Sequence, residues 1–80
     1  MKIKRLVIVN SSSGDWQGLY LDDVIAVQGH SIRQQDLVRY LKDGYESVEY
    51  YETQGFWLEE EGSLPDLLDD TVEKGLFSLN

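Results

Sequence analysis

His30 is the single histidine of the chain, and Ser31 follows it directly. A histidine can act as general base for a serine nucleophile when an acid such as Asp15 orients the imidazole ring. Adjacent residues seldom form such a pair, and Ser31 is better suited to capping a helix. We therefore expect His30 to pack at a corner between a strand and a helix, and we expect no catalytic residue and no enzymatic activity.

A second group that could do chemistry is a set of four carboxylates with helical spacing. Their oxygens are the ligands that a hard cation such as Ca²⁺ or Mg²⁺ prefers. Ligands from one face of one helix rarely enclose an ion, however, and the chain contains no loop of EF-hand type. We expect a solvated helix face and neither a metal nor a cofactor at Asp66, Asp69, Asp70 and Glu73.

The third group combines glutamates with aromatic side chains between residues 45 and 61. Carboxylates two residues apart on a strand repeat every ~6.8 Å, a spacing that lysines and arginines of a nucleic-acid-binding protein could meet. Tyrosine and tryptophan are preferred anchors of protein interfaces. An acidic surface that only keeps a small protein soluble explains the same residues, so both interpretations stay open. The group comprises Glu49, Glu52, Glu59, Glu60 and Glu61 with Tyr45, Tyr50, Tyr51 and Trp57.

Charge is distributed unevenly along the chain. The net charge is −8. Residues 1–42 hold four acids and six bases, a net of +2, whereas residues 43–80 hold eleven acids and one base, a net of −10. Lys2, Lys4 and Arg5 form a small basic cluster, but the overall negative charge repels phosphate and argues against direct nucleic-acid binding. The acidic half instead predicts a basic partner.

Length and composition predict one small domain spanning residues 1–80. With 80 residues, 41% of them hydrophobic, the chain has enough apolar material to fold alone. It has no cysteine, which excludes disulfides and thiolate metal sites and suits a reducing cytosol. The apolar run Leu6–Val9 is too short for a signal peptide or a membrane span. We expect a cytoplasmic protein with no membrane partner.

The first half of the chain reads as three strands and a helix. Apolar residues at consecutive positions predict a central strand over Ile3–Val9. Residues 16–21 and 24–29 predict a hairpin that turns at Asp22-Asp23. Its expected pairs are Leu21 with Val24, Tyr20 with Ile25, Leu19 with Ala26 and Gly18 with Val27, and Gly18 leaves room for Trp16 and Tyr20 to close over it.

Both faces of this hairpin are apolar, which predicts either a hairpin sandwiched between other elements or one face that serves as an interface. We take the sandwiched arrangement as the default. A helix follows from about Ile32 to Asp43, with Ser31 as its N-cap and Gly44 in a left-handed conformation at its end. Its expected inner face carries Gln34, Leu37, Val38 and Leu41.

The second half predicts a hairpin and a second helix. Tyr45–Thr53 alternates like a strand, and Gln54-Gly55 is a turn into a further strand over 56–61. This register places Tyr51 opposite Leu58 and Glu49 opposite Glu60, an unfavourable pairing of like charges that nothing in the hairpin itself neutralises. The second helix begins at 63–66, with a serine cap and a proline in its first turn, and runs to Gly75. We expect the apolar tail over 76–79 to dock on the core.

Together these elements predict an α+β fold: a small mixed or antiparallel sheet of about five strands with two helices, in the order βββαββα. The inner face of the second helix follows the period of an amphipathic helix. It carries Leu64, Leu67, Leu68, Thr71 and Val72.

One block of the chain resembles a pattern found in small uncharacterised bacterial and phage proteins, D-W-x-G-L-Y followed by G-H-S. Here it is Asp15-Trp16-Gln17-Gly18-Leu19-Tyr20 and Gly29-His30-Ser31. Those relatives tend to carry a glycine where this chain has Asp23. The resemblance covers about a third of the chain and implies a compact bacterial or phage domain without a known activity.

In size and charge the chain is also similar to small acidic inhibitors from mobile elements, including anti-CRISPR proteins and nucleic-acid mimics. We therefore expect a non-enzymatic acidic protein that occupies a basic, nucleic-acid-binding surface of a partner protein. The alternative is an accessory subunit or homodimer that assembles through the apolar hairpin around Trp16 and Tyr20. The expected partner-binding residues are Glu49, Glu52, Glu59, Glu60, Glu61, Tyr50, Tyr51, Trp57, Asp66, Asp69, Asp70 and Glu73.

Overall fold

The structure is a computed structural model that describes residues 3–42 and 44–78. Five strands form one sheet, and two helices of seven residues or more accompany a short third one. In chain order the elements are β1 (Ile3–Asn10), β2 (Gln17–Leu21), β3 (Val24–Gly29), α1 (Gln34–Leu41), β4 (Tyr45–Thr53), α2 (Trp57–Glu61), α3 (Leu68–Lys74) and β5 (Leu76–Ser78).

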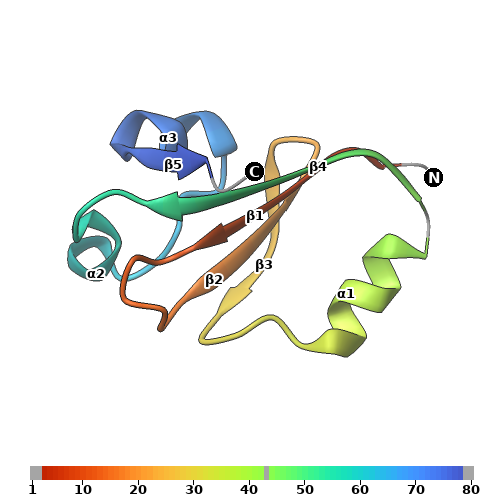
Figure 1. Ribbon diagram of the computed structural model, residues 1–80, viewed down its shortest axis with the longest axis horizontal. Coiled ribbons are helices and arrows are strands. Elements are labelled where there is room, and N and C mark those ends of the chain that lie inside the picture. Colours follow the sequence, from red (N-terminus) through yellow and green to blue (C-terminus); the bar gives the residue numbers. More distant parts are fainter. Residues whose placement is uncertain (1–2, 43, 79–80) are drawn as a thin grey trace.

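The sheet has the order β3-β2-β1-β4-β5, with β1 in the middle (Figure 1). β1 runs parallel to β4, and the other three pairs are antiparallel. The predicted α+β class, the sheet of about five strands and the central position of β1 are therefore confirmed, and of the two sheet types predicted, mixed or antiparallel, the sheet is mixed. The element order agrees with the predicted one through β4 and changes after it.

The β2–β3 hairpin turns where the sequence predicts. Asp22 and Asp23 have φ angles of +51° and +73°, the left-handed pair that a type I′ turn requires. Leu21 pairs with Val24 and Tyr20 with Ile25 as expected, but the register then shifts. A bulge at Ala26 places Val27 opposite Leu19 and Gln28 opposite Gly18, so the two predicted pairs beyond Ile25 are wrong.

The turn also contacts β1. The Asp22 carboxylate accepts the backbone N–H groups of Lys4 and Arg5, both at 2.9 Å. The Asp22 N–H donates to the Arg5 carbonyl at 2.9 Å. An aspartate at this position therefore joins the hairpin to the strand beside it, which a glycine could not do through a side chain.

α1 is shorter than predicted and lies loosely on its face of the sheet. It begins after Arg33, which makes no side-chain capping bond, so Ser31 is not the N-cap. Leu37 packs on the sheet as expected, but Val38 is 63% exposed and Leu41 is exposed as well. Gly44 has the predicted left-handed conformation, and the predicted end at Asp43 lies outside the described residues.

Residues 57–61 form α2, so the predicted strand over 56–61 is wrong. Leucine and glutamate favour helices, and glutamate is depleted in strands. Leu58 is the buried residue of α2, and Gly62, with φ +84°, closes its end by donating its N–H to the Leu58 carbonyl at 2.8 Å. The predicted pairs of Tyr51 with Leu58 and Glu49 with Glu60 therefore do not exist. β4 pairs instead with β5, which forms from the predicted tail.

α3 begins at Leu68, later than predicted, and Ser63 does not cap it. Pro65 disfavours helical backbone in the residue before it, and the chain bends at Asp66 before Leu67, in extended conformation, bridges to Val24 at the edge of β3. There the Ile25 N–H donates to the Asp66 carbonyl at 2.8 Å, and the Leu68 N–H donates to the Asp23 carbonyl at 2.9 Å. Of the predicted inner face, Leu64, Leu68 and Thr71 are buried, whereas Leu67 and Val72 are exposed.

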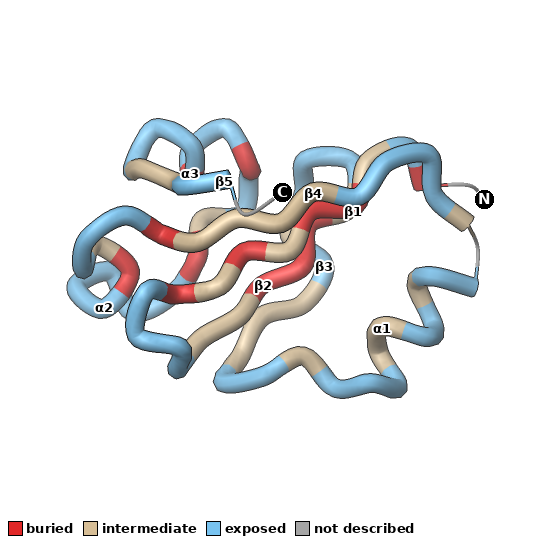
Figure 2. The backbone as a smooth tube through the Cα atoms, in the orientation of Figure 1, coloured by how far each residue is buried: buried red, intermediate tan, exposed pale blue. Residues whose placement is uncertain are grey.

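Each face of the sheet has its own hydrophobic cluster, and the buried backbone is concentrated in β1 and β2 (Figure 2). On the α2/α3 face, the buried residues are Val7, Val9, Tyr20, Leu58, Leu64 and Leu68. On the α1 face, Ile3, Leu6 and Leu19 are buried and contact partly buried residues that include Ile32, Leu37 and Tyr40. The hairpin is therefore covered on both faces, as the default prediction had it.

At Gly18 a leucine of the segment before α3 packs directly against the sheet backbone. A Cβ atom placed on Gly18 would lie 2.2 Å from Cδ1 of Leu64. Leu64 therefore fills the space above Gly18, and the expectation that Trp16 and Tyr20 close over it is wrong. Leu64 is 2% exposed, so it has little freedom to move away.

We predict that Gly18→Ala destabilises the fold by about 1–3 kcal/mol, the usual cost of overpacking a core. Urea unfolding followed by circular dichroism measures this cost. Gly29→Ala is the matched control, because a Cβ on Gly29 meets nothing within 4 Å. In a Leu64→Ala background the Gly18 substitution should cost far less, since the clashing methyl is gone. Equal losses from both glycine variants would contradict the close contact.

Candidate functional site

Seven exposed carboxylates lie on α2, on α3 and on the segment between them, and we call this set the α2–α3 acidic surface. α2 turns Leu58 into the core and leaves the three glutamates that follow in solvent. α3 buries Leu68 and Thr71 and exposes the acids between and after them. Lys74 is the single basic residue of the segment 56–75. The carboxylates are Glu59, Glu60, Glu61, Asp66, Asp69, Asp70 and Glu73.

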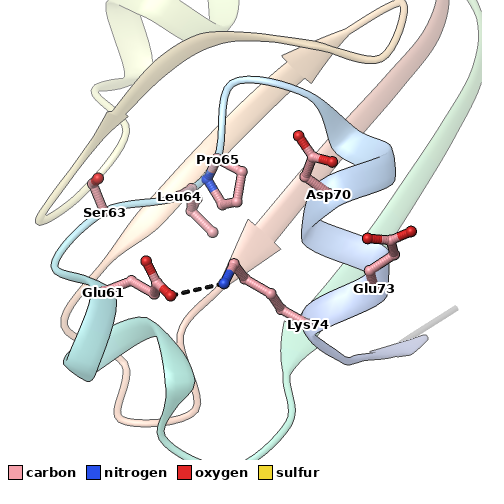
Figure 3. A pocket seen from close by; sticks show the side chains of 7 residues that line it. All are labelled: Glu61, Ser63, Leu64, Pro65, Asp70, Glu73 and Lys74. Atoms are coloured by element: carbon pink, nitrogen blue, oxygen red, sulfur yellow. Dashed lines mark hydrogen bonds and ion pairs between the residues drawn. The ribbon is translucent and has the colours of Figure 1, made fainter.

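A cleft of about 540 Å³ opens between α2 and α3. Glu61, Asp70 and Glu73 line it, and Lys74 reaches across it toward α2 (Figure 3). The Lys74 Nζ atom lies 2.7 Å from a Glu61 carboxylate oxygen and 5.9 Å from the centre of the Trp57 ring. The cleft thus already holds an ammonium group between a carboxylate and an aromatic face, an arrangement in which both interactions favour a cation.

The segment that connects α2 to α3 is held by side chains of the sheet. Gln28 accepts the Leu64 N–H at 2.7 Å and donates to the Leu64 carbonyl at 3.2 Å. The Tyr20 hydroxyl donates to the Pro65 carbonyl at 2.6 Å and lies 2.6 Å from the Thr71 hydroxyl. Burial raises the pKa of Tyr20, and the nearby carboxylates of α3 and its lead-in add to this effect. The α2–α3 acidic surface therefore rests on a rigid support.

Glu49 has an intramolecular partner outside the predicted hairpin, whose own sequence holds no base to neutralise it. Arg5 forms a two-pronged ion pair with Glu49 and also contacts Asp23 at 2.9 Å. The Tyr51 hydroxyl donates to the same carboxylate at 2.5 Å. These hydrogen bonds, Arg5 first, lower the pKa of Glu49 to about 2, and the same carboxylate raises the pKa values of Arg5 and Tyr51.

The twelve expected partner-binding residues do not form one surface. Seven make up the α2–α3 acidic surface. Glu49 and Tyr51 belong to the Arg5 network, while strand alternation places Tyr50 and Glu52 on the α1 face. The Tyr50 hydroxyl accepts a hydrogen bond from the Asn10 amide. Trp57 is half-buried and donates its indole N–H to the Gly75 carbonyl at 3.0 Å.

The pairing of Arg5 with Glu49 and of Lys74 with Glu61 was not predicted, and Arg5 was noted only as part of a basic cluster. Lys74 carries a signal in the sequence, because it is the one base among eleven acids in residues 43–80. Arg5 has no such signal, because its partner lies 44 residues away. His30 lies after β3, where its Nδ1 atom is 3.2 Å from the Asp15 carbonyl oxygen. Its ring meets the Trp16 ring edge-on, with centroids 5.2 Å apart.

Residues 3–42 and 44–78 contain no group of three or more Asp, Glu and His side chains placed to share a metal ion. None of the helices in this part of the chain is long and apolar enough to cross a membrane. The chain matches no protein-family model, no curated protein and no solved structure.

The lowered pKa of Glu49 predicts a specific dependence of stability on pH. Since its folded-state pKa of about 2 lies below the ordinary value of 4.5, the ion pair stabilises the fold above about pH 4.5. That contribution is lost progressively as the pH falls toward 2. Thermal unfolding measured from pH 7 to pH 2 should show it.

We expect Glu49→Gln to lower stability at pH 7 by about 1–2 kcal/mol, a charged hydrogen-bond pair discounted for partial exposure, and to flatten the acid side of the profile. Glu60→Gln removes the same charge from an exposed position of α2 and should change stability by less than about 0.5 kcal/mol. If the two variants show the same pH profile, the Arg5–Glu49 pair does not stabilise the fold.

Proposed function

We propose that this protein is a non-enzymatic binding protein whose α2–α3 acidic surface covers a basic surface of a partner protein. The sharper form of the proposal is an inhibitor that occupies a site where the partner binds nucleic acid. Carboxylates then take the place of phosphates against lysines and arginines of the partner. The inhibitor would act by occupancy and needs no cofactor.

The observation that carries the proposal is the excess of exposed carboxylates on this surface. Seven acids face one base in the segment 56–75, and all seven acids are exposed. On the sheet, by contrast, Arg5 of β1 neutralises the charge of Glu49 on β4. The uncompensated negative charge is thus concentrated on α2, on α3 and on the segment between them.

Charge of this kind has two physical effects on association. It accelerates the encounter with a basic partner through long-range attraction, and it repels acidic proteins from the same surface. The cleft adds a local feature, because the position of Lys74 shows that a carboxylate and an aromatic ring are arranged to accept an ammonium group. Lysines of a partner could use the neighbouring carboxylates of Asp70 and Glu73 in the same way.

The alternative proposal, an accessory subunit or homodimer formed through the hairpin, has less support from these contacts. Tyr20 is fully buried and Trp16 is half-buried against the cluster on the α2/α3 face. Tyr20 therefore offers no surface to a second copy, and Trp16 offers only the part of its ring that is not packed on this cluster. Light scattering of the purified protein decides whether it dimerises by another surface.

Affinity capture from a bacterial lysate, followed by titration of the captured protein in purified form, tests the proposal. Replacing Glu59, Glu60 and Glu61 together by Gln should weaken binding tenfold or more. Raising the salt from about 0.05 M to about 0.5 M should weaken binding of the unmodified protein strongly, because exposed charges are screened. An affinity that does not change with salt concentration would contradict the proposal.

The matched control removes three negative charges from the opposite side of the molecule. Asp36→Asn, Glu46→Gln and Glu52→Gln alter α1 and the α1 face of β4. We expect this variant to keep most of its affinity. Equal losses from both triple variants would mean that only the net charge matters and that α2 and α3 are not the contact.

A single substitution in the cleft should act in the opposite direction. Lys74→Gln frees the Glu61 carboxylate and makes the surface more negative, so affinity for a basic partner should rise severalfold. The loss of an exposed ion pair should cost no more than about 1 kcal/mol of stability. Titration of the same captured partner measures the change, and a loss of affinity would show that Lys74 itself makes a partner contact.

A further inference from the structure

A second, smaller cavity is lined by residues of α2 and of the loop after β1. Figure 1 shows that loop approaching α2. The volume of the cavity is about 230 Å³, and we call it the Trp16 pocket. Three segments far apart in the sequence line it: the β1–β2 loop, the residue after β3, and α2 with the glycine that follows. The lining residues are Ser11, Ser13, Asp15, Trp16, His30, Leu58, Glu59 and Gly62.

The apolar part of the pocket consists of Trp16 and Leu58. Leu58 is 3% exposed and belongs to the cluster on the α2/α3 face. The Trp16 indole is fixed by its N–H, which donates to Gln28 at 3.0 Å, and by the edge-on contact with His30 at an interplanar angle of 73°. The pocket therefore has a preformed wall that combines an aliphatic and an aromatic side chain, as ligand sites usually do.

Its polar part carries negative charge and hydrogen-bond acceptors. Asp15 and Glu59 are both exposed, and neither forms an ion pair with any residue of 3–42 and 44–78. The hydroxyls of Ser11 and Ser13 lie 2.7 Å apart and also accept backbone N–H groups of the loop. Because both hydroxyls already take part in these hydrogen bonds, they are poorly placed to act as nucleophiles. They nevertheless make this part of the lining polar.

We propose that the Trp16 pocket receives a lysine side chain of the basic partner. The methylene stem would lie along Leu58 and the indole, and the ammonium group would reach the carboxylates of Asp15 and Glu59. Two carboxylates beside an aromatic ring attract a cation through both ion pairing and the ring quadrupole.

The residues that carry the acceptors line the pocket from two different segments, the β1–β2 loop and α2. This arrangement suits the three diverging donors of an ammonium better than the planar fork of a guanidinium, which matches one carboxylate in a two-pronged pair. The inference rests on the proposed function, because it names the group by which the basic partner is recognised. Glu59 belongs to both sites and connects the Trp16 pocket with the α2–α3 acidic surface.

An NMR titration of the ¹⁵N-labelled protein with hexalysine tests the pocket directly. The two indole N–H signals, from Trp16 and Trp57, report on two different places. We expect the Trp16 and Gly62 signals to shift and saturate, with smaller changes at Trp57. At the same ionic strength, hexa-acetyllysine should bind at least tenfold more weakly, and hexa-arginine should shift the Trp16 signal less.

Asp15→Asn and Glu59→Gln should each weaken hexalysine binding about threefold or more. Asp69→Asn is the matched control, because it removes one exposed charge from α3 outside the pocket. If Asp69→Asn weakens binding as much as the two pocket variants do, the pocket inference falls and the proposed acidic surface stands.

Three other outcomes also overturn the pocket inference: no shift at Trp16 under saturating hexalysine, equal binding of acetylated and free lysine, or tighter binding of hexa-arginine at Trp16. Failure of the proposed function would look different. In that case the captured partner would bind with the same affinity at all salt concentrations, whatever the behaviour of the Trp16 signal.

Discussion

The side-chain amide of Gln28 connects three segments that are distant in sequence. Its oxygen accepts both the indole N–H of Trp16 and the backbone N–H of Leu64, and its nitrogen donates to the Leu64 carbonyl. Leu64 is thereby held above Gly18, where only a glycine leaves room for it. The residues that follow Leu64 hydrogen-bond to the edge of β3 and thereby place the start of α3 against the sheet. Both candidate sites depend on this joint, because it fixes the support of the α2–α3 acidic surface and the wall of the Trp16 pocket.

Several residues of the D-W-x-G-L-Y and G-H-S block make contacts that hold the fold together. Trp16 and Tyr20 hold the segment before α3 through Gln28 and Pro65, respectively. Gln17 accepts the backbone N–H of Ile32 at 2.9 Å and so fixes the chain that leads into α1. A block of this kind would be needed for folding whether or not it touches a ligand. Resemblance in such residues therefore implies a shared framework more directly than a shared activity.

Local patterns in the sequence predicted the local structure well. The central position of β1, the turn at Asp22-Asp23 and the left-handed Gly44 follow from consecutive apolar residues and turn chemistry. Segment 56–61 was misassigned because its aromatic start suggested a strand, whereas its glutamates and Gly62 favour a helix. That one segment decides where the acids lie, so the composition of the acidic surface could be predicted but its shape could not. The Arg5–Glu49 ion pair could not be predicted from the sequence, because it depends on the parallel pairing of β1 with β4.

The turn between β2 and β3 has a consequence for how the sheet assembles. Two consecutive aspartates in left-handed conformations have a higher backbone free energy than a turn with glycine, which usually takes one of these places. Their carboxylates offset this cost only through contacts with β1, at the Lys4 and Arg5 backbone and the Arg5 guanidinium. An isolated β2–β3 ribbon would carry the backbone penalty without that compensation. The first three strands should therefore form as one cooperative unit.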